Sequence, residues 1–241
     1  PKPQNPMGEG GSSLADSNQN KSLLVHLTHM PKVVYFDAQG RAQAIRYLLA
    51  YKGVEFEDVR IAMPDWPGIK AAGTYGAGNS LPVYVDDDGT IWNQSVAILK
   101  ALSAKHGLVP EDWKQAYEVS WMEETIQDHL KKEGAMIAVM KPEASEEEIQ
   151  KTADTFTAFM TALDARWADG RTRVSGGALT GADFQVLATY TSFVSNTGLK
   201  NPSLSEKLRE STAGLENFMR VVNTIKADCQ AAVDAVQPSW V

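Results

Sequence analysis

Residues 32–53 read KVVYFDAQGRAQAIRYLLAYKG, and the fold class is decided in this stretch. The first five residues form a short apolar run that predicts a buried strand. From Gly40 to Tyr51, apolar side chains recur at helical spacing, and Gly53 is a typical residue at the end of a helix. The stretch therefore predicts a strand followed by a helix, with Tyr35 at the end of the strand, where a side chain can project into a cleft.

The same mixed pattern continues as far as about residue 106. Residues 54–61 alternate like a second strand. Residues 81–85 and 90–92 flank an Asp-Asp-Asp-Gly turn, which is a strong hairpin signal. A helix is predicted from Ser95 onward. The resulting order β-α-β-loop-β-β-α is that of a thioredoxin-like domain.

The rest of the chain, after a linker at residues 107–110, shows helical periodicity only. Its clearest apolar stripe runs from Ile149 to Trp167, at alternating spacings of four and three. Thr180 and Asp183 form a capping-box signal that opens another helix. We expect a last helical region from about Leu204 to Ala235.

The predicted fold class is α+β, with two domains. A thioredoxin-like domain covers residues 31–106, and an all-helical bundle domain covers residues 111–241. Residues 1–30 are rich in small and polar residues, and such a segment cannot bury enough surface to offset its ordering entropy. We expect a disordered N-terminal extension there, in which His26 and His29 hold no metal.

Charge, apolar runs and cysteine content narrow the functional classes. The formal net charge of −7 argues against a nucleic-acid surface, and no run approaches the ~18 apolar residues of a membrane-spanning helix. The single cysteine, Cys229, excludes an intramolecular disulfide and a CxxC redox pair. We therefore expect a protein of a reducing compartment, the cytoplasm, without nucleic-acid or membrane partners.

Five motifs in order resemble the cytosolic glutathione S-transferases, the sigma class most of all. They are the opening Tyr35–Leu49, then Trp66-Pro-Gly-Ile-Lys70, Ser80-Leu81-Pro82, Gln94-Ser95, and the capping box at Thr180 and Asp183. The resemblance covers about residues 31–235 and implies the glutathione transferase fold. One departure is the loop from Tyr75 to Pro82, which is about three residues longer than usual and borders both the glutathione site and the usual dimer contact.

The chemistry that the resemblance implies begins with the thiol of glutathione. A free thiol has a pKa near about 8.5 and is mostly protonated at pH 7. Lowering that pKa by about 2 units favours the thiolate by about 2.7 kcal/mol. The resemblance assigns this task to the Tyr35 hydroxyl, with Arg41 adding a positive field. Without the resemblance, the preferred interpretation of Tyr35 is a strand aromatic packed at a domain edge.

The other proposed glutathione ligands follow from the same motifs. Ser80, Leu81 and Pro82 resemble a turn with a cis-proline, which presents the Leu81 backbone to the cysteine of glutathione; an ordinary trans proline at a strand start is the alternative. Ser95 begins a helix whose N-terminus attracts the γ-glutamyl carboxylate, and Gln94 holds the amine end. A plain N-capping serine is compatible with that role.

Trp66 and Lys70 lie four residues apart, on one face of a short helical turn. The family uses such a pair for the glycine carboxylate; a surface lysine beside a packing tryptophan is the alternative. Glu124, or its neighbour Glu123, is the candidate for the acidic residue that reaches the glutathione amine from a partner subunit. Tyr75 is the candidate for an aromatic residue that inserts into that subunit.

The predicted function is glutathione conjugation to electrophilic hydrophobic substrates, with no cofactor and no metal. The predicted partners are glutathione, the electrophile and a second copy in a homodimer. Phe36, Trp121 and Trp240 are candidates for the apolar substrate pocket. Two alternatives remain open: a non-catalytic binding or structural module, and a sigma-type glutathione-dependent prostaglandin isomerase. A disulfide oxidoreductase is nearly excluded, because Cys229 lies far from the first strand.

Overall fold

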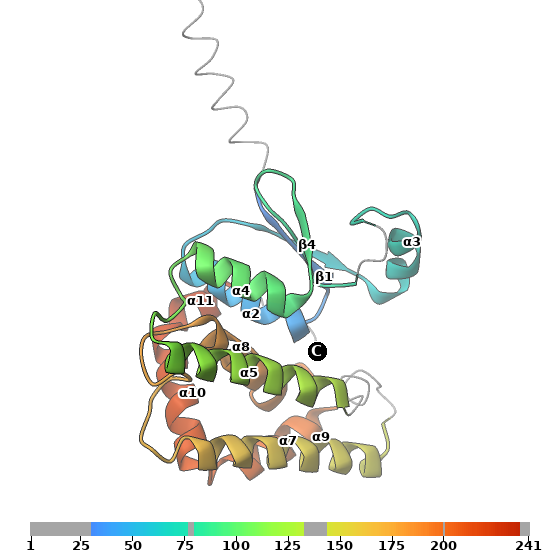
Figure 1. Ribbon diagram of the computed structural model, residues 1–241. Coiled ribbons are helices and arrows are strands. Elements are labelled where there is room, and N and C mark those ends of the chain that lie inside the picture. Colours follow the sequence, from blue (N-terminus) through green and yellow to red (C-terminus); the bar gives the residue numbers. More distant parts are fainter. Residues whose placement is uncertain (1–29, 77–79, 133–143, 200, 237–241) are drawn as a thin grey trace, which may run out of the picture.

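The computed structural model describes residues 30–76, 80–132, 144–199 and 201–236 (Figure 1). The predicted N-terminal extension, except for its last residue, lies outside these residues, as does Trp240. In the described ranges, no helix is both long and apolar enough to cross a membrane.

A four-stranded sheet organises the first part of the chain. Its strands are β1 (Lys32–Phe36), β2 (Glu57–Ile61), β3 (Val83–Val85) and β4 (Ile91–Asn93), in the order β2-β1-β3-β4. β1 pairs in parallel with β2 and antiparallel with β3, which pairs antiparallel with β4. The predicted order of elements in this part is confirmed, although β2 begins three residues later than the alternation indicated.

Alternate side chains of β1 enter two different cores, as the pleat of a strand requires. Val33 and Tyr35 join the main core with α2 (Gln43–Tyr51) and α4 (Ser95–Lys105). Val34 joins a smaller cluster on the opposite face, which α3 (Trp66–Ala71) covers. Figure 1 shows α2 and α4 together beside the helical part, with α3 away from them. Tyr35 therefore faces the interior between the sheet and the helices.

Helices make up the second part. They are α5 (Trp113–Lys132), α7 (Glu146–Arg166), α8 (Gly181–Thr189), α9 (Pro202–Thr212), α10 (Glu216–Asp228) and α11 (Gln230–Ala235). The predicted stripe from Ile149 to Trp167 is buried, with Trp167 fully enclosed. One hydrophobic cluster joins the sheet part to the helices, and α8 packs against α2. The site at the boundary between the two parts therefore rests on a continuous core.

The capping box at the start of α8 is confirmed. The backbone N–H and the hydroxyl of Thr180 both donate to Asp183 Oδ2, at 2.8 and 2.7 Å, and Val174 N–H donates to Oδ1 at 2.9 Å. Burial raises the pKa of Asp183, and these hydrogen bonds oppose that shift. These hydrogen bonds fix the N-terminus of α8, the helix that packs against α2.

The last helical region was predicted as continuous and is in fact divided into α9, α10 and α11. The chain turns at Gly214, and the N-terminus of α10 is capped from a distance by Asp164 of α7. Asp164 Oδ1 accepts from the backbone N–H groups of Asn217 and Phe218, at 2.8 and 2.9 Å. Periodicity alone missed the break because this cap comes from another helix.

Cys229, between α10 and α11, is 1% exposed. Burial raises the pKa of its thiol to about 12, so the thiol stays protonated and unreactive.

Candidate active site

Tyr35 stands at the end of β1 with 3% of its surface exposed. Its Oη accepts a hydrogen bond from the backbone N–H of Arg41, at 3.5 Å. Burial raises the pKa of the phenol, while this hydrogen bond and the positive charges of Arg41 and Arg46 oppose the shift. The phenol therefore remains protonated at neutral pH, and its hydroxyl can donate to an anionic sulfur.

Gly40 makes the close approach between Tyr35 and Arg41 possible. Its φ is +42°, a region that L residues with side chains rarely adopt. A Cβ at this position would lie 2.9 Å from Tyr35 Oη. Sequence analysis treated Gly40 only as a helix start, although a glycine between a strand and a helix was a usable signal.

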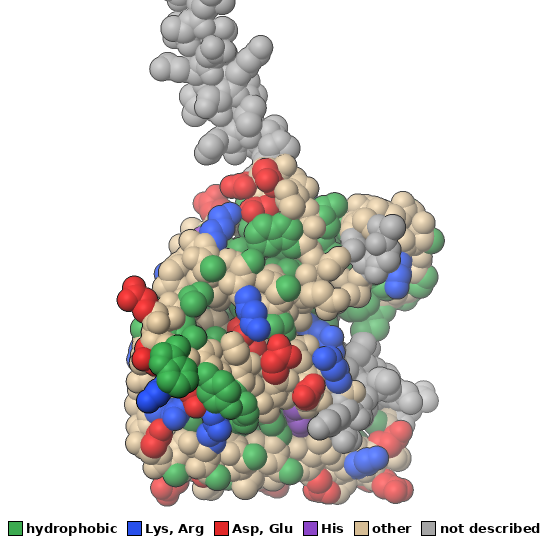
Figure 2. Space-filling model, in the orientation of Figure 1, with side chains coloured by type: hydrophobic (Ala, Val, Ile, Leu, Met, Phe, Trp, Pro, Cys, Tyr) green, Lys and Arg blue, Asp and Glu red, His purple; other side chains and the backbone are tan. Residues whose placement is uncertain are grey.

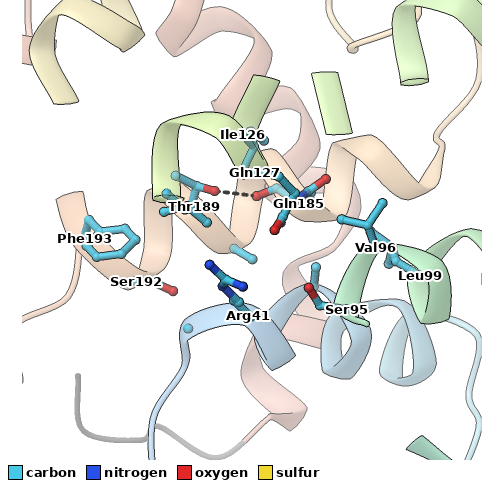
Figure 3. A pocket seen from close by; sticks show the side chains of 14 residues that line it. Arg41, Ser95, Val96, Leu99, Ile126, Gln127, Gln185, Thr189, Ser192 and Phe193 are labelled. Carbon is cyan, nitrogen blue, oxygen red and sulfur yellow. Dashed lines mark hydrogen bonds between the residues drawn. The ribbon is translucent and has the colours of Figure 1, made fainter. Parts of the chain in front are cut away.

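A narrow cavity of about 30 Å³, with a mostly apolar lining and a few polar side chains, opens beside this turn. Figure 3 shows Arg41 pointing into it, with Ser95 on one side, Ser192 on the other, and Gln127 and Gln185 opposite. No carboxylate of the described residues pairs with the Arg41 guanidinium. Two buried oxygens at this cavity, Gln185 Oε1 and Ser192 Oγ, also have no hydrogen-bond partner in the described part of the chain. The cavity therefore combines an uncompensated cation with unused hydrogen-bonding groups.

α4 begins at Ser95, as predicted, but Ser95 does not occupy the capping position. Gln94 is the residue that precedes the helix, and its side chain makes no capping hydrogen bond. Gln94 has φ 68° and ψ 101°, so the chain turns into the helix through a strained residue, and Ser95 is already helical. Such strained residues cluster at functional sites. The expected capping role of Ser95 is wrong, while its position at the helix N-terminus beside Arg41 is as predicted.

The turn before β3 contains a cis peptide bond between Leu81 and Pro82, as the resemblance implied. The last pair in the β1–β3 register joins Val34 to Val83, so Pro82 comes next to Tyr35. Pro82 is buried, Leu81 half-buried and Ser80 exposed. This turn therefore lies at the same end of the sheet as Tyr35.

Trp66 and Lys70 lie on one face of α3, as predicted. The Trp66 ring packs edge-on against Phe36, with centroids 6.3 Å apart, and joins the smaller cluster of the sheet. Lys70 is exposed. Tyr75, the candidate for insertion into a partner, is half-buried against the same cluster of its own chain.

Glu123 and Glu124 of α5 both face Lys100 of α4 and not the cavity. Lys100 Nζ lies 3.3 Å from Glu123 Oε2 and 3.7 Å from Glu124 Oε1. Glu123 is 1% exposed, and burial raises its pKa, whereas Glu124 is exposed. Within one chain, Gln127 of α5 reaches the cavity in place of either glutamate. A contact from Glu124 of the partner subunit stays a prediction.

The cavity residues that sequence analysis missed are Gln127, Gln185 and Ser192. They come from α5, α8 and the π-helical turn at Tyr190–Val194. A π-helical segment often marks a functional site, but it carries no sequence signal of its own. Only the packing of the helices on α2 and α4 brings these side chains together.

The candidates for the apolar substrate pocket are not gathered in one place. Phe36 packs on Tyr35, with ring centroids 5.4 Å apart. Trp121, on α5, packs its ring against the Arg166 guanidinium, with Arg166 Cζ 3.8 Å from the ring centroid. Among the described residues, the densest group of potential metal ligands is Asp86–Asp88 in the β3–β4 turn. Asp86 Oδ1 lies 3.1 Å from Lys105 Nζ, and the three aspartates form the turn between β3 and β4. Their place in the hairpin turn therefore accounts for the cluster without a metal.

Comparisons with known proteins point to the same stretch. The family model "Glutathione S-transferase, N-terminal domain" matches residues 31–103. A glutathione S-transferase class-mu 28 kDa isozyme of Schistosoma mansoni is 36% identical over 126 residues, covering 50% of this chain and 56% of that protein. The chain thus spans little more than half the length of that relative.

A longer alignment links the chain to a second relative. The hematopoietic prostaglandin D synthase of Homo sapiens is 30% identical over 155 residues, covering 64% of this chain and 74% of that protein. Among solved structures, the glutathione S-transferase from Ascaris lumbricoides superposes with a TM-score of 0.69 at 20% identity, over 87% of this chain and 98% of that one. The structural match shows a shared fold.

Proposed function

The chain belongs to the cytosolic glutathione S-transferase family, and from this premise we propose that it conjugates glutathione to electrophilic, largely apolar substrates. The observation that carries the proposal is the buried, protonated Tyr35 hydroxyl beside Arg41 and the start of α4. The thiol of glutathione first releases its proton to solvent, and the resulting thiolate is the nucleophile. With a chloronitrobenzene, the new carbon–sulfur bond forms as the carbon–chlorine bond breaks and chloride leaves. We place this activity in the cytoplasm, where thiols are kept reduced.

Tyr35 would stabilise the thiolate by donating its hydroxyl proton in a hydrogen bond. Hydrogen bonds to charged groups contribute roughly 1.5–3 kcal/mol, which covers most of the ~2.7 kcal/mol needed for a pKa lowered by about 2 units. The backbone N–H of Arg41 occupies a lone pair of Oη, so the oxygen is oriented while its own proton stays available. The Arg41 charge adds a favourable field at the sulfur.

The two carboxylates of glutathione would bind at opposite ends of the site. The γ-glutamyl carboxylate fits the unpaired Arg41 and the N-terminus of α4 at Ser95, with Gln94 near the amine. The glycine carboxylate fits the exposed Lys70 and the Trp66 indole on α3. Between them, Ser80, Leu81 and Pro82 would hold the cysteine through its backbone. No metal and no cofactor takes part in this proposal.

The test is glutathione conjugation to a chloronitrobenzene-type electrophile by the wild type and Tyr35→Phe. We expect a fall of at least about tenfold in kcat/KM, or ~1.4 kcal/mol, with glutathione binding retained in calorimetry. Tyr84→Phe is the matched control, since Tyr84 is a buried sheet tyrosine whose hydroxyl bonds to Asp86 instead. Binding without turnover in the wild type would instead support a non-catalytic module.

A second candidate activity is glutathione-dependent prostaglandin isomerisation. The supporting observation is the 30% identity to the human prostaglandin D synthase. It would use the same thiolate, so Tyr35→Phe affects both reactions, and turnover of a cyclic endoperoxide separates them. Absence of that turnover in an enzyme that conjugates chloronitrobenzenes would remove this candidate.

A homodimer is part of the proposal. Trp113 and Tyr117, four residues apart on α5, are 73% and 56% exposed, and Figure 2 shows hydrophobic side chains gathered over this end of the helix. Neighbouring exposed aromatic side chains often mark interaction surfaces. We expect a dimer in sedimentation experiments and a monomer for the double variant Trp113→Ser, Tyr117→Ser. A monomeric wild type would remove the role of Glu124 of the partner subunit.

A further inference from the structure

Arg46, on α2, is a fully buried arginine that no step of the proposed reaction uses. Its side chain is 0% exposed. Nε donates to Asp58 Oδ1 at 2.9 Å, and Nη1 donates to the carbonyl oxygens of Ala38 at 2.8 Å and Gln39 at 3.4 Å. Nη2 has no hydrogen-bond partner among the described residues. Nη1 also donates to Gln43 Oε1 on the same helix, at 3.3 Å. The guanidinium therefore contacts one carboxylate, one amide side chain of its own helix and the loop that follows β1.

A second arginine holds the same loop through the same carboxylate. Arg60 Nη2 lies 2.8 Å from Asp58 Oδ2, and Arg60 Nη1 lies 3.0 Å from Asp37 Oδ1. Asp58 and Arg60 both belong to β2, which pairs with β1. Residues 37–39 are thus fixed at one side chain and two carbonyls by a chain of alternating charges, which we call the loop clamp (Asp37, Arg46, Asp58, Arg60).

The clamped loop carries the geometry of the proposed thiolate site. Residues 37–39 connect Tyr35 and Phe36 to Gly40 and Arg41. The left-handed Gly40 and the 3.5 Å contact from Arg41 N–H to Tyr35 Oη depend on where this loop ends. A shift of the loop by 1 Å would break that contact and move the Arg41 guanidinium in the cavity.

Stability alone is a weak explanation for so buried a charge. Removing an arginine from water is costly, and replacing a buried ion pair with apolar groups is often neutral or stabilising. A role in fixing one conformation accounts better for an arginine whose planar guanidinium joins a carboxylate through Nε to two successive carbonyls through Nη1. Resting on the proposed function, we propose that Arg46 is a positioning residue that sets the Tyr35–Arg41 geometry through the loop clamp.

The experiment compares Arg46→Met, which removes the charge, with Arg46→Lys, which keeps it but loses the fork. Asp58→Asn removes the carboxylate charge that both arginines of the loop clamp contact. It replaces Arg46→Met as the test variant if Arg46→Met does not fold. Arg220→Met is the matched control. Arg220 is also an arginine that donates to loop carbonyls, those of Trp167 and Arg171, but it lies in α10, away from the site.

Two readouts are measured on the full chain at a temperature where every variant stays folded. The first is amide hydrogen exchange of residues 39–41. The second is the pKa of the thiol of bound glutathione, followed by the ultraviolet absorbance of the thiolate. We expect Arg46→Met to speed the exchange and to raise that pKa by about 1 unit, which is a tenfold fall in the ratio of thiolate to thiol at any given pH. Arg46→Lys should be intermediate, and Arg220→Met should match the wild type in both.

Unchanged amide exchange in Arg46→Met would overturn the proposal, whether or not the enzyme turns over. Faster exchange with an unchanged thiol pKa would also overturn it, because the loop would then move without affecting the site. A wild type that binds glutathione only as the thiol is a different failure. It would refute the thiolate proposal for Tyr35, while the exchange data would still decide whether Arg46 holds the loop.

Discussion

The two ends of the proposed glutathione site are built in different ways. The inner end (Tyr35, Gly40, Arg41, Ser95) lies between the sheet and the helices, with a buried phenol, a left-handed glycine and a strained residue beside it. The outer end (Trp66, Gly68, Lys70) is the short helix α3, whose lysine is exposed. The positions of the side chains at the inner end are fixed by packing, whereas the main charged group at the outer end, the Lys70 ammonium, is exposed to solvent. Substitutions should therefore have larger effects at the inner end.

The largest expected difference is between two glycine substitutions. Gly40→Val places a side chain against Tyr35 Oη at φ +42°, so we expect a loss of ~1–3 kcal/mol in stability and more than a tenfold fall in kcat/KM. Gly68→Ala meets no atom within 4 Å and lies in a helix, so we expect a gain of up to ~1 kcal/mol. Thermal unfolding and conjugation assays check both. Similar effects at the two positions would contradict the comparison.

A smaller difference is expected between the two cations. Arg41→Met removes the partly buried charge at the cavity and should weaken glutathione binding by ~1.5–3 kcal/mol, about 10- to 150-fold. Lys70→Met removes an exposed charge, for which ~0–1 kcal/mol is expected. Calorimetric titration with glutathione measures both dissociation constants. A greater loss at Lys70 would reverse the assignment of the two carboxylates.

The smallest effect concerns the adjacent glutamates of α5. Burial raises the folded-state pKa of Glu123 above its unfolded value, so its contribution to stability is fully present below the unfolded pKa and is lost as the pH rises through the folded pKa. Glu123→Gln should thus be stabilised relative to wild type, by less than ~1 kcal/mol at neutral pH and by less in acid. Glu124→Gln is the exposed control. Denaturant unfolding at several pH values measures the difference, and an equal response of both variants would contradict the burial argument.

The inner end was only partly predictable from sequence, for a physical reason. Tyr35, Arg41 and Ser95 belong to local motifs, and a strand, a turn and a helix start place such residues without knowledge of the rest of the chain. Gln127, Gln185 and Ser192 reach the cavity only because two helices and a π-helical turn pack on the sheet part. No spacing in the sequence encodes that contact.

The same distinction explains the errors in the fold. The order of strands and helices along the first part of the chain and the cis bond before Pro82 follow from local patterns and the family motif. The break between α9 and α10 depends on Asp164, which is remote in sequence. Ser95 was wrongly expected to cap α4, because Gln94, with its unusual backbone conformation, occupies the capping position. Glu124 was selected as an acidic residue on the right helix, but its neighbours place it at Lys100.

The most direct test of the central claim is the pKa of the thiol in bound glutathione, titrated by thiolate absorbance in the wild type and in Tyr35→Phe. The account predicts a value about 2 units below the free-thiol value of about 8.5 in the wild type, and a return of at least about 1 unit toward it in the variant. A wild-type pKa near that of free glutathione, or equal values in both proteins, would contradict the assignment of Tyr35 as the residue that stabilises the thiolate.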